Sequence, residues 1–452
     1  MDRSAHAASS WHWSRHGTVK ELVSFGYLAR ALIYERSDQA SLERRRDVWV
    51  RRLIRHAYDQ VPYYRTLLRR ASIHPDEIQG VRDLHKIPVS TKQDLLSAGL
   101  DQVLARNYTG ARLLHSSTSG SSGLIFDAWS SPAYGCLRKA FGVRHLFSFG
   151  NGGRLTDRIL RFGWTTRRPE DERMRLLPFR TMMSYEDPDR MIAAINAYRP
   201  TILHGYPSVL RLIAQHAVER GAPLWRPRLV FAAGELLDDG TRQVVERAFG
   251  SPPRNLYGTT ELGYMAVECA KRQGMHVYED NVVLEIVDTD RVVPPQAPGD
   301  IVATTLHGYA MPFIRYQVGD AGCLDTRRCA CGISSARLVI AEGRSDDMVR
   351  LRDGRQLAPR VILRYFNENV PGLREFQVTQ LAYEQFVVKA VVGPDFTHEG
   401  MRNLKANIAN EVPGAHVQVG IVPSIERGRT GKHKAFVQMI PTNGCSQEAR
   451  SA

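Results

Sequence analysis

The sequence lacks several features that define whole classes of protein. Its 452 residues contain no run of apolar residues long enough to span a bilayer, so we expect no membrane partner. The N-terminal stretch MDRSAHAASSWHWSRHG has no apolar centre of the signal-peptide type, and we therefore expect a cytoplasmic protein. Six cysteines are too few for a disulfide framework in so long a chain, and clustered thiols in a reducing compartment more often bind metal.

Acidic residues are scarce relative to basic ones, with 47 Asp and Glu against 61 Lys and Arg and a net charge of +14. Such an excess raises the alternative of a zinc-stabilised nucleic-acid-binding protein. Clustered aromatics for base stacking are not evident, which weakens that alternative. Much of the excess is arginine scattered along the chain. One segment of helical periodicity is expected to have a solvated basic face formed by Arg44, Arg45, Arg46, Arg51, Arg52 and Arg55.

The length of the chain suggests one large domain and at least one smaller one. Helical periodicity covers residues 18–72, with a break expected at Pro62. From about residue 110, short apolar runs precede amphipathic segments, as where TILHG comes before YPSVLRLIAQHAVERG. This alternation predicts an α/β fold with parallel strands. The later runs VVLEIVD, GDIVATTL and MPFIRYQVGD predict strands of a more sheet-rich part.

The pattern changes again after GRSDD at residues 343–347. The runs EFQVTQ, QFVVKAVV and HVQVGIVP predict strands around a helix at 398–412, which together make a compact α+β unit. We therefore place a large N-terminal domain at residues 1–345, with a helical part at about 18–105. A small domain follows at 346–440, and a tail at 441–452.

The stretch 115-HSSTSGSSGLIFD-127 consists mostly of hydroxyls and glycines and contains no lysine. Gly120 and Gly123 would let the backbone turn tightly with its amides pointing inward. The hydroxyls of this stretch add donors from Ser116, Ser117, Thr118, Ser119, Ser121 and Ser122. Such a loop can wrap a phosphate, although an ordinary surface loop is as common an interpretation.

A second group of residues suggests a metal site. Cys269 is followed by His276, and the step Cys329-Ala330-Cys331 comes later. Two thiolates one residue apart plus a Cys/His pair can supply four tetrahedral ligands, which predicts a closed, structural zinc site. Alternatively these are unrelated small residues with His276 packing in a strand. Cys323 is a possible replacement ligand, while Cys136 and Cys445 look unrelated.

The hydroxyl loop is the first of several motifs in a fixed order. After it come 255-NLYGTTELGYMAVEC-269, 312-PFIRYQVGD-320, 343-GRSDDMVRLRDGRQLAP-359 and 427-RGRTGKHKAF-436. This order resembles the adenylate-forming ligase superfamily, and within it the phenylacetate–coenzyme A ligase family and its capsule-biosynthesis relatives. The resemblance covers roughly residues 50–438. It implies a large adenylate-forming domain with parallel sheets and a small, mobile α+β C-terminal domain.

The resemblance also implies a reaction and its residues. ATP and Mg²⁺ would activate a carboxylic acid as an acyl-adenylate, and the acyl group would then pass to coenzyme A, a carrier-protein thiol or an amine. Tyr257 would lie against the adenine, and Thr260 would bond the α-phosphate. Glu261 would bind Mg²⁺, and Asp320 the ribose. The remaining nucleotide-binding residues would be Ser117, Thr118, Ser119, Gly120, Ser121, Ser122, Gly123, Gly234, Glu235, Gly258, Thr259 and Arg344.

Leu124 stands where loops of this family often carry lysine. The resemblance implies that Mg²⁺ and Lys432, in the step Gly431-Lys432, supply the missing charge, with Lys434 as the second choice. Asp346 would be the hinge about which the small domain rotates.

The organic acid is specified least. His204, Tyr206 and Tyr264 would line an acyl pocket that suits a flat or aryl acid, although satisfied core aromatics are an equal alternative. No cluster of charges specifies a polar acid. An amide synthetase is an alternative within the class, and a protein that binds a nucleotide without turnover is another. The sequence is compatible with a monomer and with a dimer.

Overall fold

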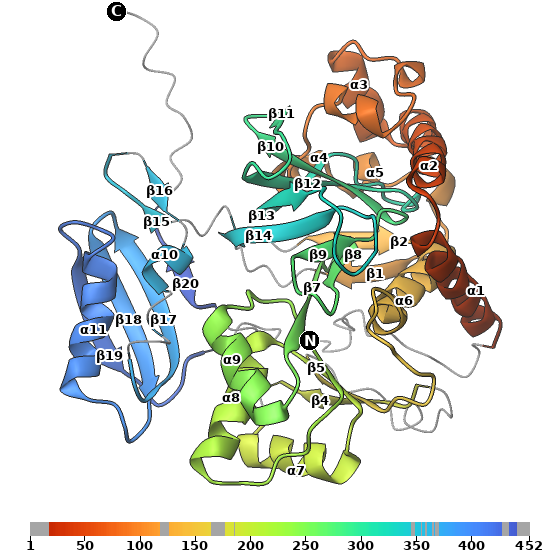
Figure 1. Cartoon of the computed structure of the whole chain (residues 1–452). Coiled ribbons are helices and arrows are strands. Elements are labelled where there is room, and N and C mark those ends of the chain that lie inside the picture. The colour runs from red at the N-terminus through yellow and green to blue at the C-terminus, as the bar shows by residue number, and fades with distance from the viewer. Residues whose placement is uncertain are drawn as a thin grey trace, which may run out of the picture. The chain divides into compact units, whose positions relative to one another are not determined.

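A computed structural model describes residues 18–117, 126–163, 177–184, 186–344, 349–353, 355–357, 359–363, 366, 370–426 and 434–440. The described residues up to Ala341 form one compact unit and those from Glu342 onward form a second (Figure 1). The expected boundary after residue 345 stays a prediction, because residues 345–348 lie outside the described ranges.

The first unit begins with helices. They are α1 (Thr18–Glu35), α2 (Gln39–Gln60), α3 (Pro62–Arg70), α4 (Lys92–Ala98) and α5 (Leu100–Val103). The predicted break at Pro62 is confirmed, since proline occupies the first position of α3, where its missing amide proton costs nothing. None of the described helices combines the length and apolarity that crossing a bilayer requires.

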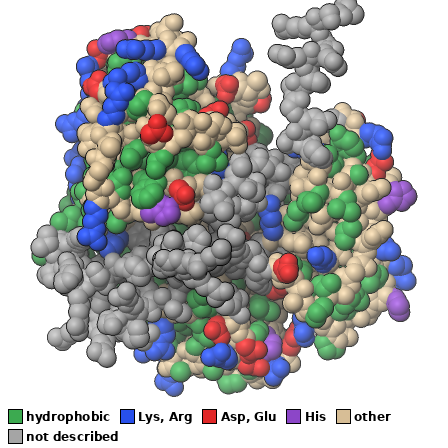
Figure 2. Space-filling view, turned by 180° about the vertical axis from the view of Figure 1, so that it is seen from behind, with side chains coloured by type: hydrophobic (Ala, Val, Ile, Leu, Met, Phe, Trp, Pro, Cys, Tyr) green, Lys and Arg blue, Asp and Glu red, His purple; other side chains and the backbone are tan. Residues whose placement is uncertain are grey.

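The predicted basic face of α2 is largely exposed, with one exception. Arg46 keeps only 12% of its side chain exposed and forms an ion pair with Glu279 at 3.3 Å. The other arginines named above are exposed. Blue Lys and Arg side chains stand over this end of the first unit at the upper left of Figure 2.

A mixed sheet of 12 strands forms the centre of the first unit, in the order β11-β10-β12-β13-β14-β9-β8-β7-β6-β5-β3-β4. The strands β4, β3, β5, β6 and β7 run parallel, as predicted from the alternating pattern. Their bounds are Phe179–Met183, Ile159–Gly163, Ile202–Gly205, Leu229–Ala233 and Pro253–Thr259.

The other half of this sheet contains antiparallel pairs. Its strands are β8 (Gly263–Glu268), β9 (Met275–Val277), β10 (Val282–Asp288), β11 (Arg291–Val292), β12 (Gly299–Thr305), β13 (Tyr316–Asp325) and β14 (Arg337–Arg344). The strand expected in MPFIRYQVGD starts only at Tyr316. The preceding Arg315 has a φ of 43°, a left-handed conformation that interrupts an extended chain.

Helices cover both faces of the parallel half. On one face, Leu160, Leu203 and Val230 pack against α7 (Pro188–Tyr198), α8 (Pro207–Glu219) and α9 (Asp239–Phe249). On the other face, Ile159, Ile202 and Phe231 pack with Phe141 and Leu146 of α6 (Pro132–Phe147). Because side chains alternate along a strand, the residues at positions 161 and 204 belong to the α6 face.

The second unit is an α+β fold, as predicted. Its four strands are β17 (Leu373–Ala382), β18 (Gln385–Val392), β19 (His416–Ile421) and β20 (Phe436–Gln438), in the order β19-β18-β17-β20. The helix α11 (His398–Ala409) packs Leu404 and Ile408 into the core with Phe386. A hairpin of β15 (Val349–Arg350) and β16 (Gln356–Leu357) and the helix α10 (Pro359–Leu363) complete the unit.

Candidate functional site

The motif YGTTE forms the turn between β7 and β8. Gly258 lies so close to the returning strand that a Cβ there would be 2.4 Å from the carbonyl oxygen of Gly263, which only glycine avoids. The amide of Leu262 donates to Thr259 Oγ1 at 3.2 Å and thereby closes the turn. This local geometry holds Thr260 and Glu261 at the tip.

Two side-chain hydrogen bonds join this turn to β13. The Tyr257 hydroxyl donates to Asp320 Oδ2 at 2.8 Å, and the Tyr316 hydroxyl donates to Glu261 Oε1 at 3.2 Å. Glu261 is 7% exposed, so its carboxylate depends on such partners. The residues predicted for adenine, ribose and Mg²⁺ are therefore brought together, although they come from distant parts of the sequence.

Arg138 of α6 contributes to the same turn and escaped the sequence analysis. Its Nη2 donates to the carbonyl oxygen of Thr260 at 2.6 Å, across 122 positions of sequence. Burial lowers the pKa of Arg138, which Tyr134 and Glu261 partly oppose, and its buried Nε has no partner within the described ranges. No motif or spacing could have indicated this residue, because helix packing alone brings it to the turn.

The hydroxyl loop starts from a hairpin of β1 (Leu114–Ser117) and β2 (Asp127–Ser130). Ser117 ends β1 opposite Asp127, and the Ser116 hydroxyl donates to the carbonyl of Ala128 at 3.3 Å. Asp127 lies 2.9 Å from His115 Nε2, so this carboxylate at the loop's base already has a partner. Residues Thr118, Ser119, Gly120, Ser121, Ser122 and Gly123 lie outside the described ranges.

Gly234 and Glu235 follow β6. Gly234 has a φ of 83°, which favours glycine. The Glu235 carboxylate accepts hydrogen bonds from Ser208 N at 3.0 Å and from Ser208 Oγ at 3.1 Å. Glu235 thus stabilises the first turn of α8, where a negative charge is favourable.

Two of the residues predicted for the acyl pocket, His204 and Tyr264, form an aromatic group with His145 and Phe231, while Tyr206 packs against the core under α7, α8 and α9. His204 lies 6.5 Å from Tyr264 and 5.7 Å from His145 between ring centroids, and His145 lies 4.6 Å from Phe231. Burial lowers the pKa of His145 to about 3 and that of His204 well below its usual range. Burial also raises the pKa of Tyr206 to about 12. At neutral pH this group therefore presents uncharged rings.

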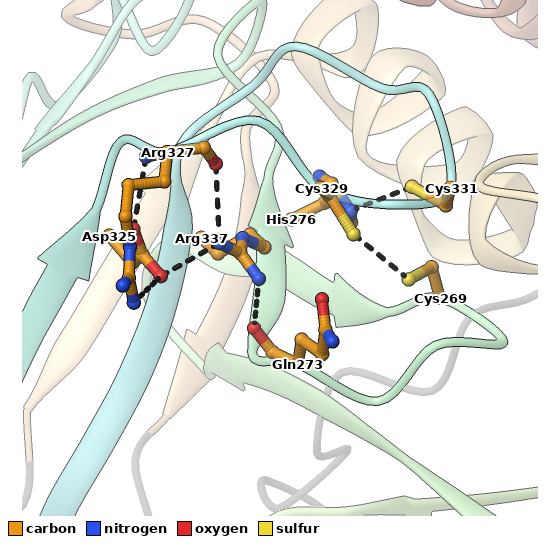
Figure 3. A network of polar contacts seen from close by, with 8 residues as sticks. All are labelled: Cys269, Gln273, His276, Asp325, Arg327, Cys329, Cys331 and Arg337. Atoms are coloured by element: carbon orange, nitrogen blue, oxygen red, sulfur yellow. Dashed lines mark hydrogen bonds and ion pairs between the residues drawn. The ribbon is translucent and has the colours of Figure 1, made fainter.

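The four predicted zinc ligands lie together. The candidate ligand atoms of Cys269, His276, Cys329 and Cys331 are all within 4.8 Å of one another. Figure 3 shows them converging from the end of β8, from strand β9 and from the segment between β13 and β14, with Cys269 Sγ 3.8 Å from Cys329 Sγ and Cys331 Sγ 3.2 Å from His276 Nε2. Cys323, the alternative ligand, does not belong to this described group.

Neighbouring residues orient this Cys/His group. His276 Nδ1 lies 3.1 Å from Ser335 Oγ, which leaves Nε2 facing the thiols. Arg337, 4% exposed, donates to Gln273 O at 2.7 Å and to Asp325 Oδ2 at 2.7 Å, which ties these segments together (Figure 3). Burial lowers the pKa of His276 to about 4, so the imidazole is neutral, as metal binding requires.

The remaining predicted residues lie near or beyond the described ranges. Lys432 and Asp346 fall outside them, and Arg344 is the last residue of β14, with its side chain outside the description. Lys434 is described, and its backbone carbonyl accepts a 3.0 Å hydrogen bond from Gln377.

Comparisons with known proteins identify the family of the chain. The family model "AMP-binding enzyme" matches residues 174–309. The phenylacetate-coenzyme A ligase of Thermus thermophilus is 30% identical over 329 residues, which cover 67% of this chain and 70% of that protein. The chain belongs to the phenylacetate–coenzyme A ligase family. A ligase of the same name from Aromatoleum evansii is 26% identical over 89% of this chain and 96% of its own, and Protein CapK of Staphylococcus aureus is 24% identical over 57% and 58%.

The fold is also that of a solved ligase. A crystal structure of 2-hydroxyisobutyryl-CoA ligase in its postadenylation state superimposes with a TM-score of 0.72, at 18% identity over 89% of this chain and 90% of that one. The protein is accordingly an acyl-adenylate-forming ligase, of the acid–thiol or acid–amine kind.

Proposed function

We propose that the protein joins a carboxylic acid to coenzyme A at the expense of ATP. A carboxylate oxygen attacks the α-phosphorus of ATP, the bond to the bridging oxygen breaks, and pyrophosphate leaves. The coenzyme A thiol then attacks the acyl carbon of the adenylate, AMP departs, and the thiol proton passes to water. The first step brings two anions together, so it depends on alignment and on neutralised charge.

The residues around the YGTTE turn carry the first step. Tyr257 stacks on adenine, and Asp320 accepts the ribose hydroxyls. Thr260 bonds the α-phosphate. Glu261 is placed to hold Mg²⁺, a hard cation that suits carboxylate oxygen and neutralises phosphate charge when bound. The observation that supports this assignment is a pair of hydrogen bonds, from Tyr257 to Asp320 and from Tyr316 to Glu261. Together they link the YGTTE segment to β13 and bring the two acidic groups to the same place.

Arg138 positions this turn rather than touching substrate. Its bond to the Thr260 carbonyl places a guanidinium behind the residue assigned to the α-phosphate. Since the hydroxyl loop has no lysine, this half-buried cation adds favourable potential near the reacting phosphate. Lys432 is the second proposed source of positive charge for the α-phosphate, and Asp346 is the proposed hinge for the change between the two steps.

Coenzyme A is the acceptor favoured by family membership, since relatives that cover most of the chain are coenzyme A ligases by name. An amine or a carrier-protein thiol would use the same adenylate. The experiment is exchange of labelled pyrophosphate into ATP across a panel of aryl and aliphatic acids. The active acid is then incubated with ATP and coenzyme A, an amine or a carrier protein, and products are identified by mass. Absence of exchange with every acid would contradict the proposal.

We further propose that Cys269, His276, Cys329 and Cys331 hold one structural zinc ion. Sulfur ligands at about 2.3 Å from zinc in a tetrahedron lie about 3.8 Å apart. The observed separation of Cys269 Sγ and Cys329 Sγ is also 3.8 Å. Four protein ligands leave no position for substrate, so the ion would brace the segments that hold it and take no part in the reaction. Metal analysis of the purified protein tests this proposal.

A further inference from the structure

An arginine lies beside the aromatic group assigned to the acyl chain. Arg161 of β3 stands in register with His204 of the parallel strand β5, so both side chains emerge on the α6 face. A Cβ added at Gly163 would lie 3.0 Å from Arg161 Nε and 3.3 Å from Nη2. The guanidinium therefore extends toward the carboxyl end of the strand, the edge at which open α/β sheets bind their ligands.

Among the described residues, no carboxylate pairs directly with Arg161. Its half-buried side chain makes no ion pair and no hydrogen bond with any of them. Its neighbours on the α6 face include the rings of His204, Tyr264 and His145, which packing places together. Burial keeps the histidines neutral, and the nearby Arg161 cation further lowers the pKa of His204.

One nitrogen of these rings also lacks a well-aligned partner within the described part of the chain. His145 is 4% exposed, and no described group meets its Nδ1 with hydrogen-bond geometry. A buried polar atom without a partner is unfavourable, and a half-buried guanidinium surrounded by neutral rings is more so. Both features point toward a ligand that brings hydrogen-bonding groups and negative charge into this group of side chains.

We propose that the acid activated by this enzyme carries a second carboxylate, distal to the reacting one, which pairs with Arg161. This inference rests on the proposed function and names the class of its acid. A planar carboxylate matches the fork of guanidinium donors, and a single arginine neutralises its single charge. The rings of His204, Tyr206 and Tyr264 then enclose the carbon skeleton between the two carboxylates.

The test compares matched acids that differ only in the distal group, such as phenylacetate with 4-carboxyphenylacetate and hexanoate with adipate. Pyrophosphate exchange gives kcat/KM for each acid in wild type, Arg161→Met and Arg161→Lys. Wild type should favour the diacid of the better pair roughly 10- to 100-fold, the range expected for a charge-assisted contact. The ratio should fall to about one in Arg161→Met and lie between in Arg161→Lys. Arg158→Met, at the exposed position just before the same strand, is the matched control and should keep the wild-type ratio.

A binding measurement keeps the inference separate from turnover. Calorimetry compares sulfamoyl-adenosine analogues of the two acyl-adenylates with wild type and with Arg161→Met. Tighter binding of the diacid analogue, lost in Arg161→Met, supports the inference. Equal binding of both analogues overturns it, and so does a change in Arg161→Met that appears only in the KM for coenzyme A.

Exchange with monoacids and no preference for diacids overturns the inference and leaves the proposed function standing. If no acid supports exchange, the proposed function fails and the calorimetric ratio still decides the role of Arg161. Should Arg161→Met fold poorly, Arg161→Lys supplies the same comparison.

Discussion

The hydroxyl of Tyr257 donates a 2.8 Å hydrogen bond to the carboxylate of Asp320, 63 residues further along the chain. This bond joins the strand that ends in the YGTTE turn to the strand that carries the proposed ribose acceptor. It orients the carboxylate, so the two polar groups should differ in importance: the Asp320 carboxylate makes the proposed contact with ribose, and the Tyr257 hydroxyl positions that carboxylate.

Asp320→Ala should therefore raise the KM for ATP in pyrophosphate exchange roughly 10- to 100-fold, because hydrogen bonds to a charged group are worth about 1.5–3 kcal/mol each. Tyr257→Phe keeps the ring and loses one hydrogen bond, so an increase of about 2- to 10-fold is expected. A larger effect from Tyr257→Phe than from Asp320→Ala would contradict these roles.

The lysine assigned to the α-phosphate can be separated from its neighbour two positions on. Lys432→Ala should abolish exchange and leave thioester formation from added acyl-adenylate intact, since the proposed role of Lys432 is confined to the first step. Lys434→Ala is the matched control and should retain exchange. Equal loss in both variants would show that the G-K step has no special role.

Arg138→Met removes the donor to Thr260 O and leaves a carbonyl without its partner. We expect a loss of about 1–3 kcal/mol in unfolding free energy and an exchange rate lowered roughly 10-fold or more. Lys139→Met, one position along the same helix, controls for general loss of positive charge. Thermal unfolding and exchange at saturating ATP provide the measurements, and unchanged kcat in Arg138→Met would exclude a positioning role.

The zinc proposal predicts about one zinc ion per chain by elemental analysis. A Cys329→Ser/Cys331→Ser double variant should lose the ion and unfold at a temperature several degrees lower, because the ion braces the segments that hold it. Cys323→Ser should keep the ion and its stability. A metal-free wild type that is as stable as the zinc-loaded protein would end this proposal.

His145 makes stability depend on pH. Its pKa is about 3 in the folded protein and near 6.5 when unfolded, so the unfolded state binds more protons below pH 6.5. Stability is therefore complete above about pH 6.5 and falls by about 1.4 kcal/mol per unit as the pH drops toward 3. His145→Phe keeps a ring against Phe231 and should show a shallower loss of melting temperature between pH 7 and 5. The same slope in both proteins would show that other groups dominate.

Much of the fold followed from local patterns. Proline at position 62 separates two helices because its ring cannot continue the first, and the alternating runs near TILHG became β5 and α8. The strand at MPFIRYQVGD was placed too early, because the left-handed backbone at Arg315 depends on its buried bonds to Thr304 and Glu285. Those partners lie on other strands and leave no signature near position 315.

The sequence alone indicated the family, the order of the nucleotide-binding motifs and the Cys/His set, because each motif or residue pair is a short local pattern that can be read without the fold. Only the folded structure decided that Arg138 stands behind Thr260 and that Arg161 stands beside His204. These contacts arise when helix packing and strand register bring distant segments together. Local sequence patterns do not predict such long-range contacts. The sequence therefore offered no indication of the dicarboxylic acid that we infer, because it contains no cluster of charged residues that specifies a polar acid.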